Sequence, residues 1–157
     1  MQERSSESTP LHQHSGARLA VAALFASMCA GASAQTPPPP VPVKVTVVPA
    51  GEVPPVGGAC MPPAGGNKVC VDKDPVRTPG VPVDTPVAIV WTLTTQGWTF
   101  VKNQGIDIKN KKSWQLKEDS STKYTATNKK EKGDPYKYDV NVTDGKTPLK
   151  FDPTIMN

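Results

Sequence analysis

Histidine is missing from the stretch of sequence that could form a folded domain. Both histidines of the 157-residue chain lie near its start, at His12 and His14. Residues 35–157 therefore lack the commonest general base, the usual ligand of transition metals and the central member of a serine–histidine–aspartate triad. Serine is also scarce there, with only Ser113, Ser120 and Ser121. We expect a protein that is not an enzyme, without a catalytic, cofactor-binding or metal site.

The acidic residues are the remaining candidates for chemistry, and the local sequence explains most of them. Aspartate precedes proline at Asp74, Asp134 and Asp152. In such pairs the carboxylate bonds nearby amides and the proline fixes the next φ, so they indicate turns. Glu118 and Asp119 are adjacent, and neighbours on a strand point to opposite faces. The alternative, an enzyme that acts on envelope polysaccharide with carboxylates alone, needs two of them about 5 to 9.5 Å apart.

Lysines give the chain its formal net charge of +4 and concentrate between residues 102 and 137. The residues that could face an anion are Lys109, Lys111, Lys112, Lys129, Lys130 and Lys132. The stretch has no arginine and only three separated aromatic residues, Trp114, Tyr124 and Tyr136. It does not have the arginines interleaved with aromatic residues that bind phosphates and stack on bases, so we expect no nucleic-acid partner. Two interpretations remain. The lysines are either a solvated surface that keeps exposed strands soluble, or the face with which an inhibitor or stress protein binds an acidic envelope protein or an anionic surface.

An uncharged apolar run at residues 19–34 follows Arg18 and ends in small residues. This pattern is typical of a signal peptide and predicts cleavage between Ala34 and Gln35. The run is shorter than the roughly 20 apolar residues of a membrane-spanning helix, so we expect no membrane span in the mature chain. Acylation at Cys29 is an alternative, although the residue before it is larger than such a site prefers. The long polar segment before Arg18 leaves open a start codon further downstream.

Two cysteines, Cys60 and Cys70, follow the expected cleavage site. An even number of cysteines in an exported chain predicts a disulfide rather than two free thiols. Closing a loop of about 11 residues would stabilise the fold by roughly 2.5 to 3 kcal/mol. Together with the signal-peptide pattern, the disulfide predicts a periplasmic or extracellular protein.

Proline is abundant in the first part of the mature chain, and strand signals follow it. Of the 18 prolines, 14 lie between residues 36 and 86, which excludes helices there. We expect a Pro-rich linker at residues 35–42 and a single β domain at 43–157. Short runs of strand-forming residues recur along that domain, most of them at spacings near ten. They cover residues 43–47, 68–71, 87–93, 98–101, 106–109, 114–116, 124–126, 136–143 and 149–151.

These runs predict an antiparallel, immunoglobulin-like β-sandwich of about seven to nine strands, with a small β-barrel as the alternative. The run at 43–47 is flanked by prolines, which predicts an edge strand. The run at 87–93 is apolar on both faces, which predicts a central strand covered on both sides. Asp144 and Gly145 predict a two-residue type I′ hairpin between the last two strands.

The last part of the chain resembles a known family in three motifs. They are Gly97-Trp98-Thr99-Phe100, Tyr136-Lys137-Tyr138-Asp139-Val140 and the ending Phe151-Asp152-Pro153-Thr154-Ile155-Met156-Asn157. Over roughly residues 87–157 the chain is similar to the DP-EP family of small exported bacterial proteins. The resemblance implies a shared kind of fold and a bacterial cell envelope as the setting, and it implies no particular chemistry.

The features above favour a non-enzymatic, exported β-sandwich protein with a binding or structural role in the bacterial cell envelope. No motif indicates its ligand, its partner or its oligomeric state. Such a protein is expected to have a featureless surface without a deep polar pocket.

Overall fold

The computed structural model describes residues 36–53, 57–61, 66–82, 84–129 and 135–156. The contacts between residues divide the chain into Met1–Ala34 and Gln35–Asn157, and all described residues belong to the second unit. The expected signal peptide, its cleavage site between Ala34 and Gln35, and Cys29 lie outside the described residues. In the described part, no helix is long and apolar enough to cross a lipid bilayer.

Strands make up almost all of the regular structure. They are β1 (Val41–Val48), β2 (Ala59–Cys60), β3 (Lys68–Val71), β4 (Val76–Arg77), β5 (Pro86–Leu93), β6 (Thr99–Phe100), β7 (Ile106–Ile108), β8 (Trp114–Ser120), β9 (Lys123–Lys129), β10 (Tyr136–Thr143), β11 (Pro148–Phe151) and β12 (Thr154–Met156). A short 3-10 helix, η1 (Lys111–Ser113), precedes β8. Each of the nine predicted runs contains strand residues.

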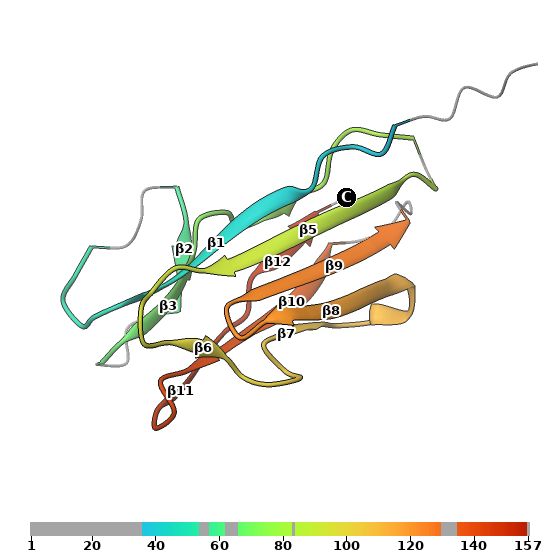
Figure 1. Ribbon diagram of the computed structural model, residues 1–157. Helices are drawn as coiled ribbons and strands as arrows, with labels where there is room; N and C mark the ends of the chain where they lie inside the picture. The colour runs from blue at the N-terminus through green and yellow to red at the C-terminus, as the bar shows by residue number, and fades with distance from the viewer. Residues whose placement is uncertain (1–35, 54–56, 62–65, 83, 130–134, 157) are drawn as a thin grey trace, which may run out of the picture. The chain divides into compact units, whose positions relative to one another are not determined.

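Two sheets pack face to face (Figure 1). The first has the strand order β2-β3-β1-β5-β9-β8. In the second, β10 pairs with β11, β12, β6 and β7, and β12 also pairs with β4. Neither sheet closes into a barrel, so the predicted sandwich is confirmed and the barrel alternative is wrong.

Side chains at alternate positions of the strands form the core. Val43, Val45 and Val47 of β1 are buried, and so are Ile89 and Trp91 of β5, because every second side chain of a strand points to the same face. Ring contacts then join the sheets, with centroid distances of 5.4 Å for Trp91–Tyr138, 5.1 Å for Phe100–Tyr124 and 5.7 Å for Trp114–Tyr136. Tilted and edge-to-face pairs of this kind add roughly 0.5 to 1.5 kcal/mol each to the burial of the rings.

The strand pairing corrects the prediction of purely antiparallel sheets. The strand β1 runs parallel to β5 and β12 runs parallel to β4. The prediction that residues 43–47 form an edge strand is also wrong, because β1 lies between β3 and β5. Its proline is tolerated because residues 41–45 pair with β5 while only residues 45–48 pair with β3, so Pro42 has a neighbouring strand on one side alone.

Three further predictions need correction at the ends of elements. The expected linker at residues 35–42 is too long, since Val41 and Pro42 already belong to β1 and pair with β5. The β10–β11 hairpin has four loop residues, 144–147, and only Gly145 among them has a positive φ. It is therefore not a type I′ turn: the Asp144 carboxylate accepts hydrogen bonds from the amides of Lys146 and Thr147 instead. The described residues form twelve strands rather than seven to nine, because β2, β4 and β12 were not predicted.

The central strand β5 is confirmed as central, with β1 and β9 on its two sides. Its two faces differ, however. Val87, Ile89, Trp91 and Leu93 are buried, whereas Ala88 and Val90 on the other face are only half-buried. The expectation that both faces are covered is therefore wrong.

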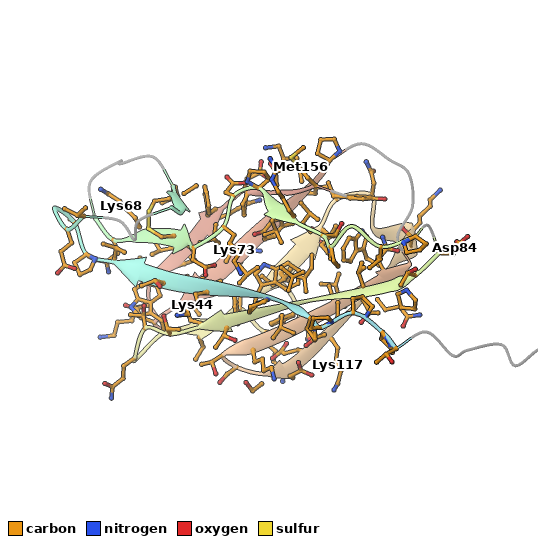
Figure 2. The ribbon with its side chains drawn as sticks, turned by 90° about the horizontal axis from the view of Figure 1, so that it is seen from above. Lys44, Lys68, Lys73, Asp84, Lys117 and Met156 are labelled. Atoms are coloured by element: carbon orange, nitrogen blue, oxygen red, sulfur yellow. A yellow bond between two sulfur atoms is a disulfide. The ribbon has the colours of Figure 1, made fainter. Side chains whose placement is uncertain are left out.

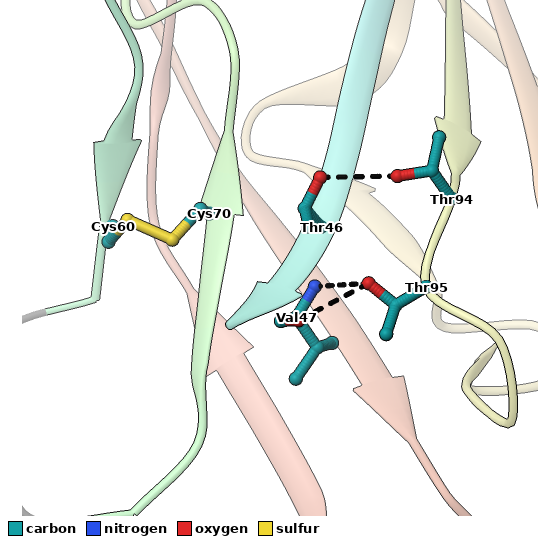
Figure 3. The surroundings of a disulfide bond; sticks show 6 residues. All are labelled: Thr46, Val47, Cys60, Cys70, Thr94 and Thr95. Atoms are coloured by element: carbon teal, nitrogen blue, oxygen red, sulfur yellow. Dashed lines mark hydrogen bonds between the residues drawn. A yellow bond between two sulfur atoms is a disulfide. The ribbon is translucent and has the colours of Figure 1, made fainter. Parts of the chain in front are cut away.

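The disulfide joins Cys60 of β2 to Cys70 of β3 (Figure 3), with Cα atoms 4.0 Å apart, and confirms the predicted pair. The two residues face each other in the antiparallel ladder. Next to it, β1 is anchored to the segment after β5: the Thr95 hydroxyl accepts a hydrogen bond from the Val47 amide at 2.7 Å and donates one to the Val47 carbonyl at 3.3 Å. The disulfide therefore attaches the outer strand β2 to β3, while hydrogen bonds hold β1 in the interior of the same sheet.

Candidate functional site

A polar cleft of about 510 Å³ opens beside the outer strands β7 and β8. Ten residues line it, namely Asn103, Gln104, Ile106, Asp107, Leu116, Glu118, Tyr124, Asp139, Asn141 and Lys150. They come from both sheets and from the loop between β6 and β7. These ten residues are called the polar cleft. The expectation of a featureless surface is therefore wrong.

The loop between β6 and β7 enters the cleft because β10 holds both of its ends. The Val101 amide donates to the Asn141 carbonyl at 3.0 Å, and the Asn141 amide donates to the Gly105 carbonyl at 2.8 Å. The residues between them must loop out, and Asn103 takes a positive φ of 60° to do so. At the end of the loop, a Cβ on Gly105 would lie 2.5 Å from Phe100 Cβ, so only glycine fits there.

A hydrogen-bonded group around Glu118 forms one wall of the cleft. The Tyr124 hydroxyl donates to Glu118 Oε2 at 2.6 Å, and the Asn103 amide donates to the same oxygen at 2.9 Å. The hydroxyl of Tyr124 also accepts a hydrogen bond from the Gly105 amide at 3.3 Å. The hydrogen bonds from Tyr124 and Asn103 lower the pKa of Glu118, while burial and the bond to Glu118 raise the pKa of Tyr124 to about 12.

A second group, centred on Asp139 of β10, forms the other wall. Asp139 is 5% exposed, and its Oδ2 bonds the ammonium groups of Lys109 and Lys150, the latter at 2.8 Å. Lys109 also bonds Asp107 at 3.2 Å. Asp107 faces Asp139 directly in the β7–β10 ladder, so Lys109 separates two like charges. Burial opposes ionisation of Asp139, but the two lysines outweigh it and hold its pKa below the ordinary value.

Of the six sequence-predicted lysines, only Lys109 and Lys112 have side chains in the described part of the chain, so the anion-facing patch stays a prediction. Lys109 is engaged by two carboxylates, chiefly through its bond to Asp139, which raises the pKa of Lys109. Lys112 is exposed. The backbones of Lys111 and Lys129 lie in η1 and β9, but their side chains are outside the described residues, as are Lys130 and Lys132 altogether. Figure 2 shows other lysines, Lys68 and Lys117, at the outside of the fold.

The acidic residues follow the sequence interpretation only in part. The Asp74 carboxylate accepts a hydrogen bond from the Thr154 amide at 2.9 Å, and because this amide is 80 positions away, the bond is not the local one expected of a turn residue. Asp134 lies outside the described residues. Glu118 bonds Tyr124 and Asp119 bonds Thr125, which are neighbours on β9, so the two carboxylates do point to opposite faces. Asp119 bonds its partner at 2.5 Å and plays no part in the cleft.

The central members of the cleft, Asp139 and Tyr124, were missed by the sequence interpretation. Asp139 alternates with apolar residues in β10, which made it look like an ordinary solvent-facing residue of a half-buried strand. Its low exposure accompanies ion pairs with Lys109 and Lys150 and a position opposite Asp107 of β7, all of them outside its own strand. The signal in the sequence was an acidic residue between the apolar residues Tyr138 and Val140, but this signal does not reveal which side chains bond the carboxylate.

Among the residues that the structure describes, no group of three histidine, cysteine or acidic side chains is arranged to hold a metal ion. No protein-family model matches the chain, and neither a curated protein nor a solved structure shows significant similarity to it. The geometry of the polar cleft is therefore the main guide to function.

Proposed function

We propose that the protein is a non-enzymatic binding protein of the bacterial cell envelope and that the polar cleft holds its ligand. The observation that carries this proposal is the engagement of the cleft carboxylates. Glu118 accepts hydrogen bonds from Tyr124 and Asn103, and Asp139 accepts them from two lysines. Fixed, ionised carboxylates in a cleft that Gln104 also lines suit a ligand that offers hydroxyl or amide groups, such as a glycan.

The same arrangement argues against Glu118 or Asp139 as the acid of a carboxylate-only glycosidase. A glycosidase needs one carboxylic acid whose pKa is raised so that it can protonate the leaving group. Here the pKa values of Glu118 and Asp139 are both lowered, mainly because Tyr124 bonds the first and because lysines outweigh burial at the second. Neither group is poised to donate a proton at neutral pH.

Export is part of the proposal and rests on the signal-peptide pattern before Ala34 together with the Cys60–Cys70 disulfide. Disulfides persist in oxidising compartments and are rare in the cytosol. Intact-mass analysis of the protein from the envelope fraction should give a chain that begins at Gln35 and is two hydrogens lighter than the reduced form. A full-length, reduced chain recovered from the cytosol would contradict this part.

Co-sedimentation with insoluble peptidoglycan sacculi tests the binding role. We expect saturable binding that Gln104→Ala weakens about two- to tenfold, the range of one lost hydrogen bond. Gln115→Ala is the matched control, because Gln115 is also exposed but lies outside the cleft. The proposal fails if the two variants bind alike. Release of reducing ends from the sacculi that Glu118→Gln abolishes would instead establish a carboxylate-only enzyme.

A further inference from the structure

An edge groove lies where the outermost strand of each sheet faces the other, at β2 and β11. Its volume is about 500 Å³, and Ala59, Cys60, Met61 and Phe151 form its apolar walls. Of the described residues, only Lys150 borders both this groove and the polar cleft. The edge groove is therefore a second surface, and its properties follow from the backbone groups along its two walls.

On the β11 wall, the backbone groups of Lys150 and Asp152 point away from the rest of the sheet. The Asn141 amide and carbonyl bond Gly105 and Val101, so Val140 and Val142 must carry the bonds from β10 to β11. Their partners are Phe151 and Leu149. The residue between them, Lys150, then directs its N–H and C=O outward, and the alternation continues to Asp152.

Further along the same edge, the outward groups are already bonded. The Thr154 amide donates to the Asp74 carboxylate at 2.9 Å, and the Met156 carbonyl accepts from the Thr78 amide at 2.9 Å. These contacts come from the segment that contains β4. The strand β4 therefore occupies one half of the edge, and in the described part of the chain no strand pairs with the other half, at Lys150 and Asp152.

Among the described residues, the β2 wall presents unpaired backbone groups in the same way. The Met61 amide donates to the Val69 carbonyl at 3.0 Å, so the pair Cys60 and Cys70, one position along the ladder, is a non-hydrogen-bonded pair. The amide and carbonyl of Cys60 thus point away from β3 and toward the outer side of β2. The disulfide fixes Cys60 in place, so this wall is held rigidly.

We propose that the edge groove binds an extended segment of a partner protein by β-strand addition. An unpaired strand edge recognises a peptide backbone through main-chain hydrogen bonds, and an apolar groove beside it selects alternate side chains. The charges select further. Asp74 and Asp152 border the groove, and the one lysine among its described residues, Lys150, is bonded to Asp139. The segment that fits is therefore apolar at alternate positions and carries a basic residue beside them.

A designed peptide tests this inference on the intact protein. The probe is a fluorescent seven-residue peptide in which valine and threonine alternate between terminal lysines. We expect saturable binding by fluorescence anisotropy, and amide chemical-shift changes at Cys60, Lys150 and Asp152 in NMR spectra. Methylating alternate backbone nitrogens of the peptide should weaken binding more than tenfold, because it removes the donors that strand addition needs. Exchanging its lysines for glutamates should also weaken binding.

A pair of matched variants tests the charge contribution. Asp152→Asn should weaken binding about two- to fivefold, the range of an exposed ion pair. Asp84→Asn is the control, since Asp84 is exposed and far from the groove. It lies at the opposite end of the strands from Lys68 (Figure 2), which belongs to β3, the strand that pairs with β2. Equal binding of the methylated peptide, shifts confined to the polar cleft, or no binding at millimolar peptide would overturn the inference. Self-association that the peptide reverses would also overturn it, because the occupant would then be a second copy of the chain.

Discussion

Replacing Asn128 with valine should stabilise the protein. Asn128 lies on β9, is 2% exposed and faces the interior between Val87 and Trp114, its neighbours on β5 and β8. Among the described residues, neither the nitrogen nor the oxygen of its side-chain amide has a hydrogen-bond partner. Folding therefore removes this amide from water without replacing the hydrogen bonds that water made.

The magnitude follows from the chemistry of the amide. Leaving a buried polar group unpaired costs about 1 to 3 kcal/mol. Valine is close to asparagine in size, so the change opens little space, and its branched side chain suits a strand. We expect Asn128→Val to raise the free energy of unfolding by about 2 kcal/mol, which for a domain of this size corresponds to roughly 5 to 10 °C in Tm.

Urea unfolding followed by tryptophan fluorescence measures this change. The midpoint should rise while the slope stays constant, since the surface exposed on unfolding is nearly the same. Thr127→Val is the control, because Thr127 is only half-buried and points to the other face of β9, and its effect should stay within about 0.5 kcal/mol. A loss of stability in Asn128→Val would refute the reasoning. It would mean that the amide is bonded in solution, for instance to the indole N–H of Trp114.

Three further predictions concern other parts of the fold. Gly105→Ala should lower the free energy of unfolding by at least about 2 kcal/mol, because the new methyl group would overlap Phe100, and an unchanged urea midpoint would contradict this. Replacing Cys60 and Cys70 together with serine should cost about 2.5 to 3 kcal/mol, so equal stability of the double variant and the oxidised protein would show that the cross-link adds nothing. The lowered pKa of Asp139 means that its ion pairs stabilise the fold above the unfolded pKa near 4 and lose that effect as pH falls through the lower folded pKa. Asp139→Asn should therefore make the free energy of unfolding depend less on pH in this acidic range, and an unchanged dependence would contradict the assignment.

The longer strands could be predicted because their signal is local. In β5 and β10, apolar residues recur at every second position over eight residues, and that period follows from the geometry of a single strand. The disulfide was predictable for a similar reason, since Cys60 and Cys70 are ten positions apart and no other cysteine follows the signal-peptide pattern.

The short strands could not be predicted, because pairing with distant segments creates them. The strand β4 has two residues and exists only through its contact with β12, about 80 positions away. The parallel pairing of β1 with β5 is equally invisible in the sequence. Prolines near β1 indicated a strand with a free edge, and Pro42 does have a neighbour on one side only, but the position of β1 inside the sheet depends on β3.

The sequence by itself determined the class of this protein: an all-β domain with one disulfide and no histidine after residue 34. The tertiary structure alone decided where its surfaces are. Asp139 meets Lys109 across 30 positions of chain, and Glu118 meets Asn103 across 15. Strand periodicity reports which face a side chain takes, but it carries no information about which distant side chain shares that face. The polar cleft and the edge groove therefore appear only once the sheets are assembled.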